Sequence, residues 1–404
     1  MQEMTWERAR DALAGLPLPS ALLDLDALEA NTDRILEMLD GTDKTLRVAT
    51  KSLRCRDVLR RIAERGGERV RGLMAYSAVE AAWLVEHGAT DVFVAYPTGR
   101  PHDARLLAEA NAGEAEAGIV VDCAAHLDLL DAAARDAGTV IPVVVEIDVS
   151  WRPFGGHIGV LRSPLRSVEA VVDLARDAEQ RGNLRFLGVM GYEAHIAGLQ
   201  DDNPFSPLLN APKRWLRRAA RGPVATLRAR LAEALDAAGL GGRLFNGGGT
   251  GSVAWTAAEA AVTEVTAGSG FVAPALFDYF AHLRDQPLRP ALSFAVQVAR
   301  IPQPGWVTVH GGGWVASGEA GPDKLPVPWL PQGLTLRSME GAGEVQTPLR
   351  VPHGVQLAVG DPVLFRHAKA GELCEHVNEL HLLRGGEVVD VVPTYRGEGR
   401  CFLG

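Results

Sequence analysis

Leu46-Arg47-Val48-Ala49-Thr50-Lys51-Ser52 is the stretch from which the rest of the chain can be interpreted. Apolar and β-branched residues lead into a lysine, and a helical pattern follows over residues 54–64. This order predicts a strand over residues 47–51, with the lysine where the next loop begins. In parallel α/β folds, catalytic groups and cofactors gather at the C-terminal ends of the strands. A lysine in that place can be a nucleophilic amine, although it can also simply reach solvent.

The composition limits the kind of protein that this chain can be. Its 404 residues are too many for one small core, so we expect two domains. A net charge of -9 argues against non-specific nucleic-acid binding, which requires a basic surface. No stretch has the uninterrupted apolar length of a membrane helix, so we expect no membrane partner. The four cysteines are dispersed without a CxxC pair, which predicts a cytoplasmic location.

A short apolar strand, a polar or glycine-rich corner and an amphipathic helix recur along most of the chain. The strands are predicted at residues 47–51, 72–76, 91–96, 118–122, 143–148, 186–192, 243–246 and 264–267. Eight such units predict an α/β fold with a closed (β/α)8 barrel of the TIM type. Beyond residues 302–305 the segments are short and β-branched, which predicts a mostly-β C-terminal domain. The predicted division is residues 20–285 for the barrel, and residues 1–19 with 286–404 for the β-rich domain.

Side chains that can do chemistry stand at the predicted C-terminal ends of the strands. They are Lys51, Tyr76, Tyr96, Asp122, Asp148 with Arg152, Tyr192 with His195, and Gly247-Gly248-Gly249-Thr250-Gly251. Core packing does not require these residue types there, so we expect them to form one site at the barrel mouth. A basic run is interpreted differently, as a solvated helix face. It consists of Lys213, Arg214, Arg217, Arg218 and Arg221.

The glycine-rich turn at residues 247–252 follows a strand and lacks the GK[ST] ending of a P-loop. Its backbone N–H groups and hydroxyls suit a single phosphate monoester, and Gly268-Ser269-Gly270 after the next strand can supply a second half. The alternative is a pair of tight strand-to-helix corners. A lysine amine that faces a phosphate cradle across a barrel mouth suggests pyridoxal 5′-phosphate, held as a Schiff base.

An ordered set of motifs carries a resemblance to a known family. The motifs are Asp24-Leu25-Asp26-Ala27-Leu28-Glu29-Ala30-Asn31, Arg47-x-x-x-Lys51, Glu146-x-Asp148 followed by Arg152 and Gly155, Gly191-Tyr192-Glu193-x-His195, and Gly248-Gly249-Thr250-Gly251. Over nearly its whole length the chain resembles the fold type III (alanine racemase-like) pyridoxal phosphate enzymes. Within them it is most similar to the D-threonine aldolase and D-serine dehydratase branch and to proteins called amino acid deaminase/aldolase. It departs from that branch at Ala49, where a histidine is usual.

The resemblance implies a role for each candidate residue. Lys51 would hold the cofactor and act as the base at the substrate Cα, and Arg152 would face the pyridine nitrogen. Tyr192 and His195 would line the cofactor ring and the substrate, unless His195 is a structural histidine. The phosphate group would be bound by Gly248, Gly249, Thr250, Gly251, Gly268 and Ser269. A divalent ion, zinc or manganese, would be held by Glu372, Cys374 and His367, unless these residues only bond to the backbone of their loop.

The resemblance also implies a reaction class. We expect a pyridoxal phosphate-dependent lyase that acts on a β-hydroxy amino acid of D configuration, by retro-aldol cleavage or by dehydration and deamination. Two alternatives stay open. One is an amino acid racemase on the same fold, with Tyr395 as a second base supplied by the partner subunit; the other is a non-catalytic protein that binds pyridoxal phosphate. The expected partners are a small-molecule amino acid and a second copy of the chain in a homodimer, with no nucleic acid.

Overall fold

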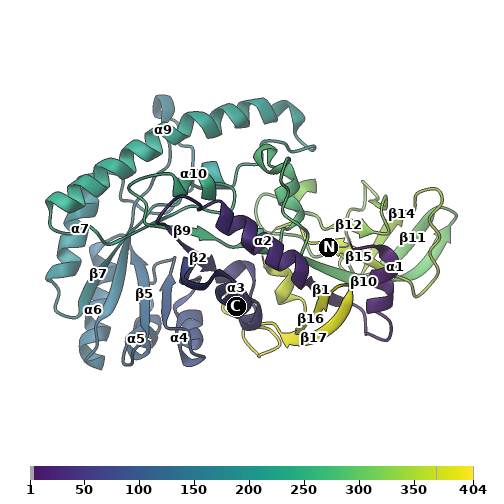
Figure 1. Cartoon of the computed structure of the whole chain (residues 1–404), viewed down its shortest axis with the longest axis horizontal. Helices are drawn as coiled ribbons and strands as arrows, with labels where there is room; N and C mark the ends of the chain where they lie inside the picture. Colours follow the sequence, from purple (N-terminus) through teal and green to yellow (C-terminus); the bar gives the residue numbers. More distant parts are fainter. Residues whose placement is uncertain (1–3, 370, 404) are drawn as a thin grey trace.

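The computed structural model describes residues 4–369 and 371–403 and contains two bodies that lie side by side (Figure 1). One is a closed barrel of eight parallel strands in chain order, β2 to β9, and the other is a nine-stranded sheet. The predicted α/β barrel with a second, mostly-β domain is therefore confirmed.

The barrel strands coincide closely with the predicted ones. They are β2 (Thr45–Ala49), β3 (Val70–Ala75), β4 (Asp91–Val94), β5 (Glu116–Val121), β6 (Ile141–Glu146), β7 (Leu184–Met190), β8 (Leu244–Gly247) and β9 (Glu264–Ala267). The strands of a parallel barrel are covered by helices on the outside and by side chains on the inside. Because both faces are buried, their sequences are continuous apolar runs. All six residues of β6 are buried, as this arrangement requires. The barrel closes where β9 pairs with β2.

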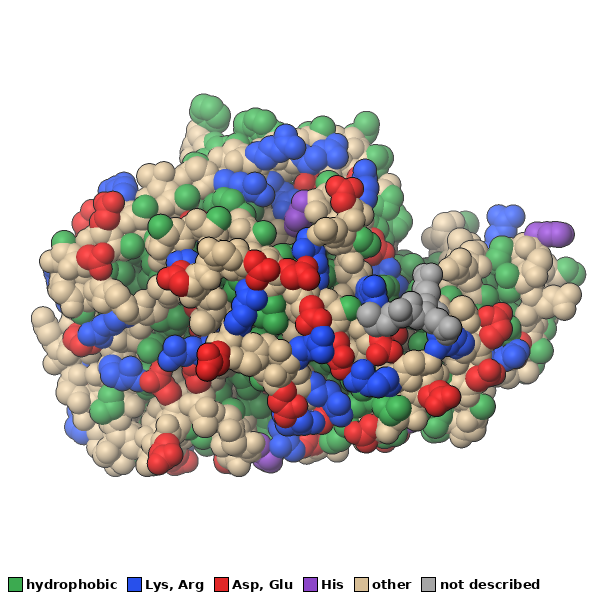
Figure 2. Space-filling view, in the orientation of Figure 1, with side chains coloured by type: hydrophobic (Ala, Val, Ile, Leu, Met, Phe, Trp, Pro, Cys, Tyr) green, Lys and Arg blue, Asp and Glu red, His purple; other side chains and the backbone are tan. Residues whose placement is uncertain are grey.

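Helices cover the outside of the barrel (Figure 1). They are α2 (Leu25–Glu37), α3 (Arg56–Gly66), α4 (Ala78–Glu86), α5 (Pro101–Ala110), α6 (Ala124–Ala137), α7 (Val168–Gln180), α8 (Ala194–Ala197), α9 (Pro207–Ala237) and α10 (Val253–Ala257). The long helix α9 runs along the top of the view, and Figure 2 shows Lys and Arg side chains gathered over that region. Within the described residues, no helix has both the length and the apolar character needed to cross a membrane.

The second sheet takes one of its inner strands from the start of the chain. The strands from the C-terminal part are β10 (Leu292–Gln303), β11 (Trp306–His310), β12 (Val327–Leu330), β13 (Thr335–Leu336), β14 (Gln346–Arg350), β15 (Pro362–Arg366), β16 (Glu379–Arg384) and β17 (Glu387–Pro393). The predicted boundary at residue 20 assigns β1 (Ser20–Asp24) to the barrel. In the structure β1 instead pairs antiparallel with β10 and parallel with β16. Its apolar side chains are buried in this second sheet, so residues 20–24 lie outside the barrel.

The two domains meet next to Lys51 through Arg54. The backbone of Arg54 has a φ of 46°, which is uncommon for a residue with a side chain. Its Nε donates to the carbonyl oxygen of Lys51 at 3.0 Å, and its Nη1 donates to Glu375 Oε1 at 2.6 Å. The N–H of Tyr395 donates to the Arg54 carbonyl oxygen at 2.8 Å. The turn after β2 is therefore held in place by the β-rich domain.

A buried ion-pair cluster links the strands inside the barrel, away from the mouth. Arg47 on β2 is 3% exposed, and its Nε donates to Glu264 Oε1 on β9 at 2.7 Å. Its Nη1 donates to Asp91 Oδ1 at the start of β4, also at 2.7 Å. Charges that are taken out of water in this way are stable only while they stay paired.

Replacing Arg47 with alanine is expected to lower the free energy of unfolding by about 3–5 kcal/mol, because Glu264 would be left buried without a counter-charge. Urea denaturation followed by tryptophan fluorescence measures this loss. Arg100→Ala is the matched control, since its side chain is 73% exposed beside Asp103, and it should cost less than about 1 kcal/mol. Similar small losses of unfolding free energy in both variants would contradict the role of Arg47 as the counter-charge of buried Glu264.

Candidate active site

A cavity of about 210 Å³ lies at the C-terminal mouth of the barrel. The predicted site residues that line it are Lys51, Tyr192, Gly248, Gly249, Thr250, Gly251, Gly268 and Ser269. These residues come from the ends of four strands, β2, β7, β8 and β9, which the closed barrel brings to one edge. The cavity is therefore the candidate active site.

Lys51 stands in the first turn after β2, within a short 3-10 helix (Thr50–Ser52). Its Nζ donates to the hydroxyl oxygen of Tyr96 at 2.8 Å. The hydroxyl of Thr50 donates to the carbonyl oxygen of Met74 at 3.1 Å, which ties this turn to β3. The lysine is half-buried in the cavity wall and held by a neighbour, so the interpretation as a surface lysine is wrong.

Glycine is required in the two turns that form another part of the wall. Gly248 has a φ of 91°, a conformation that disfavours side chains. A Cβ on Gly251 would lie 2.1 Å from the carbonyl oxygen of Ala197, and a Cβ on Gly268 would lie 2.6 Å from the Ser52 hydroxyl. Because no side chain fits there, the backbone itself forms the surface of the cavity.

Unused hydrogen-bond donors in these turns fit a phosphate group. Within the described chain, the backbone N–H groups of Thr250, Gly251 and Ser269 form no hydrogen bond. The hydroxyl of Ser269 lies 3.0 Å from that of Ser52, and the N–H of Gly270 donates to Thr250 Oγ1 at 3.2 Å. Buried backbone N–H groups normally have partners, and a phosphate oxygen would supply them. The residues present therefore fit the phosphate of pyridoxal phosphate.

The carboxylate of Glu193 holds the first glycine turn from its buried side. Glu193 is fully buried and ion-paired with Arg228, which is also fully buried. It accepts hydrogen bonds from the N–H of Gly248 at 3.1 Å and from the hydroxyls of Ser252 and Thr256. Burial opposes the charge, but Arg228 and the two hydroxyls hold the pKa of Glu193 below its ordinary value. This network fixes the turn that the predicted phosphate site uses.

The position of Arg152 differs from the one that the resemblance implies. Its side chain is exposed and pairs with Asp148 at 3.2 Å, and it does not line the cavity. Trp151 and Ile158 form an antiparallel bridge, so this loop folds back on itself, with Arg152 outside the cavity wall.

Arg162, further along the same loop, is the arginine that lines the cavity. Its guanidinium carbon lies 5.5 Å from the ring centroid of Tyr192 and 5.6 Å from that of Tyr96. Burial raises the pKa of Tyr192 to about 12, so its hydroxyl keeps its proton at neutral pH. The loop between β6 and α7 contains three arginines, Arg152, Arg162 and Arg166, and the sequence has no pattern that separates them.

Two predicted residues lie outside the cavity wall. His195 on α8 is buried, its Nε2 has no hydrogen-bond partner among the described residues, and burial lowers its pKa. Tyr76 is buried under the guanidinium group of Arg54. His195 does not line this cavity, and its role stays a prediction.

Two carboxyl groups stand side by side where β5 and β6 end. Val121 on β5 lies opposite Val145 on β6, and Asp122 and Glu146 are the residues that follow them. Glu146 is 5% exposed, and the hydrogen bond seen at this residue is to its backbone carbonyl oxygen, from the hydroxyl of Ser163 at 2.7 Å. Burial raises the pKa of Glu146 to about 7, and the nearby Arg162 opposes this shift. In the sequence, Glu146 can be recognised as a carboxylate at the end of an otherwise apolar strand.

The predicted metal ligands are dispersed. The Cys374 thiol donates to a backbone carbonyl at 3.2 Å, and Glu372 accepts from a backbone N–H at 3.3 Å. The Nδ1 of His367 lies 3.2 Å from a backbone carbonyl oxygen, and burial lowers the pKa of this histidine to about 3. In the described part of the chain, these three side chains do not place their ligand atoms within 4.8 Å of one another. Their arrangement does not fit a metal ion and agrees with the backbone-bonding alternative.

A different trio brings metal-ligand types together near the mouth. Asp122, Cys123 and His126 place one oxygen, one sulfur and one nitrogen atom within 4.8 Å of one another. Asp122 Oδ1 lies 3.1 Å from His126 Nδ1, so this pair is also satisfied as a hydrogen bond without an ion. The trio was not predicted as a ligand set.

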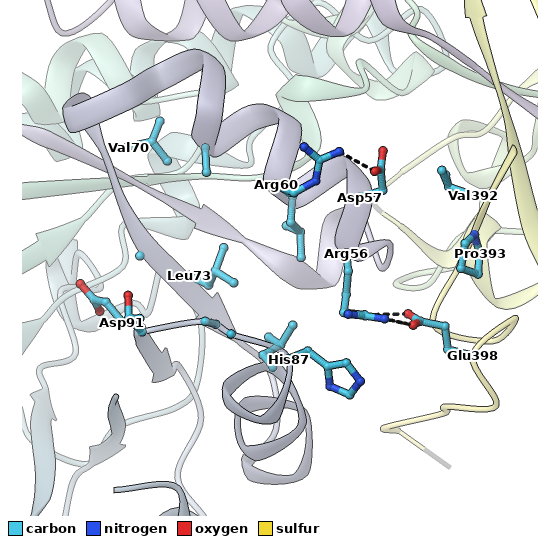
Figure 3. Close-up of a pocket in the computed structure, with 17 residues that line it drawn as sticks. Arg56, Asp57, Arg60, Val70, Leu73, His87, Asp91, Val392, Pro393 and Glu398 are labelled. Carbon is cyan, nitrogen blue, oxygen red and sulfur yellow. Dashed lines mark hydrogen bonds and ion pairs between the residues drawn. The ribbon is translucent and has the colours of Figure 1, made fainter. Parts of the chain in front are cut away.

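A larger groove of about 590 Å³ lies outside the barrel between α3 and α4 (Figure 3). Its charged side chains face one another in pairs, Arg56 with Glu398 and Arg60 with Asp57. It borders Asp91 at the start of β4, which is the end of the barrel opposite to the mouth. The groove therefore offers neither free reactive groups nor the C-terminal strand ends, and it is not the candidate site.

Comparison with known proteins finds relatives of this chain. The chain is 29% identical over 348 residues to D-threonine aldolase from Arthrobacter sp., covering 86% of this chain and 83% of that protein. It is 26% identical over 259 residues to D-threo-3-hydroxyaspartate dehydratase from Delftia sp. strain HT23, covering 64% of this chain and 62% of that protein. The crystal structure of D-threonine aldolase from Filomicrobium marinum superposes with a TM-score of 0.81 at 23% identity, over 95% of this chain and 96% of that one.

The family pattern of the alanine racemase N-terminal domain matches residues 23–273. This match spans the barrel, with Lys51 and both glycine turns. It covers more than half of the 404 residues. The chain therefore belongs to the alanine racemase N-terminal domain family.

Proposed function

We propose that this chain is a pyridoxal phosphate-dependent lyase that acts on a β-hydroxy amino acid. The observation that carries the proposal is the cavity in which Lys51 lies with two glycine turns that have unused N–H donors. Relatives named D-threonine aldolase and D-threo-3-hydroxyaspartate dehydratase support this reaction class and the D configuration of the substrate.

The residues of the cavity have complementary roles in such a reaction. Bound pyridoxal phosphate supplies the electron sink for negative charge at the substrate Cα. Lys51 is the amine that would hold the cofactor and then move a proton at Cα, and Tyr96 orients it through the 2.8 Å hydrogen bond. Tyr192 stays protonated, so its hydroxyl can donate a hydrogen bond as well as accept one. Arg162 is the cation in the cavity wall that suits a substrate carboxylate.

The racemase alternative is not favoured by the position of Tyr395. This tyrosine is 1% exposed and packs edge-on against Trp83, with 4.9 Å between the ring centroids. Its N–H is bonded to Arg54 of the same chain. A side chain buried in this way cannot be offered to the site of a partner subunit.

The assembly, the location and the metal stay proposals. We expect a homodimer, and sedimentation of a fully active monomer would contradict it. A cytoplasmic location rests on the dispersed, free cysteines. If a divalent metal takes part, the donor set of Asp122, Cys123 and His126 suits it better than the dispersed Glu372, Cys374 and His367. We derive no reaction step through a metal.

Product analysis tests the reaction class. Retro-aldol cleavage of D-threonine yields glycine and an aldehyde, whereas dehydration of D-threonine or D-serine yields a keto acid and ammonia. Ala49 lines the cavity where the branch usually carries a histidine, so this position supplies no imidazole to the β-hydroxyl group. Incubation with pyridoxal phosphate and a panel of D- and L-β-hydroxy amino acids should give one of these product sets. No product from the whole panel would overturn the proposal.

Lys51→Ala should abolish the visible absorption band of the protein loaded with pyridoxal phosphate, because the amine that holds the cofactor is lost. Lys369 is the matched control, since it also lines the cavity but donates to the carbonyl oxygen of Ser317 at 3.2 Å. Lys369→Ala should keep the band, and absorption spectroscopy with mass analysis of the borohydride-reduced protein checks both variants. A band that persists in the first variant and vanishes in the second would assign the cofactor to Lys369.

Glu193→Gln should weaken pyridoxal phosphate binding about tenfold or more, because the amide cannot pair with Arg228 while it also accepts from the glycine turn. The dissociation constant from absorbance titration measures the effect, and kcat at saturating cofactor should change less. Glu259→Gln is the control, since Glu259 pairs with the same Arg228 but does not contact the turn. Equal losses of cofactor affinity in both variants would assign the effect to Arg228 rather than to the turn.

A further inference from the structure

A second cavity of about 320 Å³ lies beside α9 and is strongly basic. The residues that line it are Arg214, Arg217, Arg218, Arg221, Asp201, Ala281 and His282. Figure 2 shows blue side chains gathered in the upper part of the view, where Figure 1 places α9. The basic run was interpreted as a solvated face, and this is wrong for Arg217, which is only 4% exposed. Packing against the loop before α9 and against residues 281–282 encloses one side of the helix.

Among the residues that the structure describes, Arg217 is the one arginine of this cavity with a carboxylate partner. Arg217 donates to Asp201 Oδ2 at 2.8 Å and to the carbonyl oxygens of Ile196 and Gly251 at 3.1 and 3.2 Å. Both carboxylate oxygens of Asp201 are thereby engaged, because the other oxygen accepts a hydrogen bond from the N–H of Ala281 at 2.9 Å. Asp201 therefore neutralises Arg217, and the other three arginines of the cavity keep their positive charge.

Arg214, Arg218 and Arg221 form no ion pair with any described residue. With Arg217 they stand at positions i, i+3, i+4 and i+7 of one helix, so like charges face each other on neighbouring turns. Arg221 is half-buried, and its Nε is cut off from solvent without a hydrogen-bond partner among the described residues. Burial and the neighbouring arginines lower the pKa of Arg221. Arg221 also lies over the ring of Trp255, 5.8 Å from its centroid, but none of the three arginines has an anionic partner in the described chain, so the cluster suits an external anion.

His282 completes the donor set. Burial and the adjacent Arg217 lower the pKa of His282 to about 4, so the imidazole is neutral at physiological pH. Its Nδ1 lies 3.2 Å from Arg217 Nη1 and accepts from that group. The proton of the neutral ring is therefore on Nε2, which leaves a donor for a ligand.

We infer that this cavity binds a phosphate dianion, with Arg214, Arg218, Arg221 and His282 as its donors. Guanidinium groups match phosphate oxygens in pairs, and three unpaired arginines favour a doubly charged group over a single carboxylate. The cavity is larger than one phosphate needs, so a phosphate monoester of a small molecule also fits.

The anion site is separate from the active-site cavity. The two cavities share no lining residue among those described. They are connected by Arg217, which lines the anion site and bonds to the carbonyl oxygen of Gly251 in the glycine turn. The inference does not depend on the proposed lyase function, because it rests on charges that the cofactor cradle does not contact.

Calorimetric titration of the full-length protein with inorganic phosphate, in Hepes-chloride at pH 7.5 and constant ionic strength, tests the site. The protein is first loaded with pyridoxal phosphate and reduced with borohydride, so that the cofactor cradle is filled. Wild type should bind one phosphate, and Arg218→Gln and Arg221→Gln should each weaken binding about tenfold. Arg230→Gln is the matched control, because Arg230 is exposed on the same helix and does not line the cavity.

The outcomes separate this site from the cofactor cradle. Absence of phosphate binding by wild type, or equal binding by all three variants, would overturn the inference. If the protein does not retain pyridoxal phosphate, the same titration is run on the untreated chain with Ser269→Ala added. Loss of binding in that variant but not in Arg221→Gln would place the phosphate in the cradle and also overturn it. Far-UV circular dichroism verifies folding, and Arg218 is exposed, so its replacement leaves the core intact.

A second titration identifies the source of the phosphate group. Glycerol 3-phosphate that binds more tightly than inorganic phosphate would support a site for an organic phosphate monoester. Equal affinities would support recognition of the phosphate group alone. Phosphate should also raise the thermal unfolding midpoint of wild type and of Arg230→Gln more than that of Arg221→Gln, because an anion relieves repulsion only where the arginines remain. A shift of the same size in all three proteins would count against the site.

Discussion

The ion pair of Glu193 with Arg228 is the interaction on which the candidate site depends. Both side chains are fully buried, so neither charge can be left without the other. The carboxylate of Glu193 accepts hydrogen bonds from the N–H of Gly248 and from the hydroxyls of Ser252 and Thr256. The guanidinium group of Arg228 also donates to the carbonyl oxygen of Gly191 at 2.6 Å. One pair of charges thereby fixes the end of β7 and the glycine turn after β8.

The long helix α9 acts on this turn at two places. Arg228 reaches it through Glu193, and Arg217 donates to the carbonyl oxygen of Gly251. Arg228 follows Arg217 by eleven positions, which is about three helical turns, so both side chains leave the helix on the same side. The helix α9 therefore positions the phosphate cradle and also lines the basic cavity. The two sites depend on the same helix, although no residue lines both.

Much of the fold could be predicted from the sequence because the barrel strands are buried on both faces. Runs such as residues 141–146 have no polar residue to interrupt them until the strand ends, where the chemistry begins. The same reasoning placed Lys51, Tyr192 and the two glycine turns at one mouth, since parallel strands end at the same edge. Strand β1 was assigned to the wrong sheet because its apolar pattern is equally suited to either.

The parts that could not be predicted depend on contacts between distant segments. Arg152 and Arg162 differ only in how their loop folds back, and no local pattern records that fold. The ion pair of Glu193 with Arg228 and the burial of Arg217 are decided by where α9 crosses the barrel, not by the sequence around these residues. Cys374 and His367 have the chemistry of metal ligands, but their loop directs both to backbone carbonyl groups.

The position of β1 between β10 and β16 has a consequence for the order in which the protein can be assembled during translation. Strands β2 to β9 all emerge after β1 and before β10, so the barrel can close while β1 still has two unpaired edges. An apolar strand with a free edge is prone to pair with other chains. Strand β10 can cover one edge of β1, but the other edge stays free until β16 (Glu379–Arg384) leaves the ribosome. The two domains are distinct in space, yet no single cut of the polypeptide separates them: a fragment ending after the barrel retains an orphan strand, and the complementary fragment lacks the strand that joins its sheet.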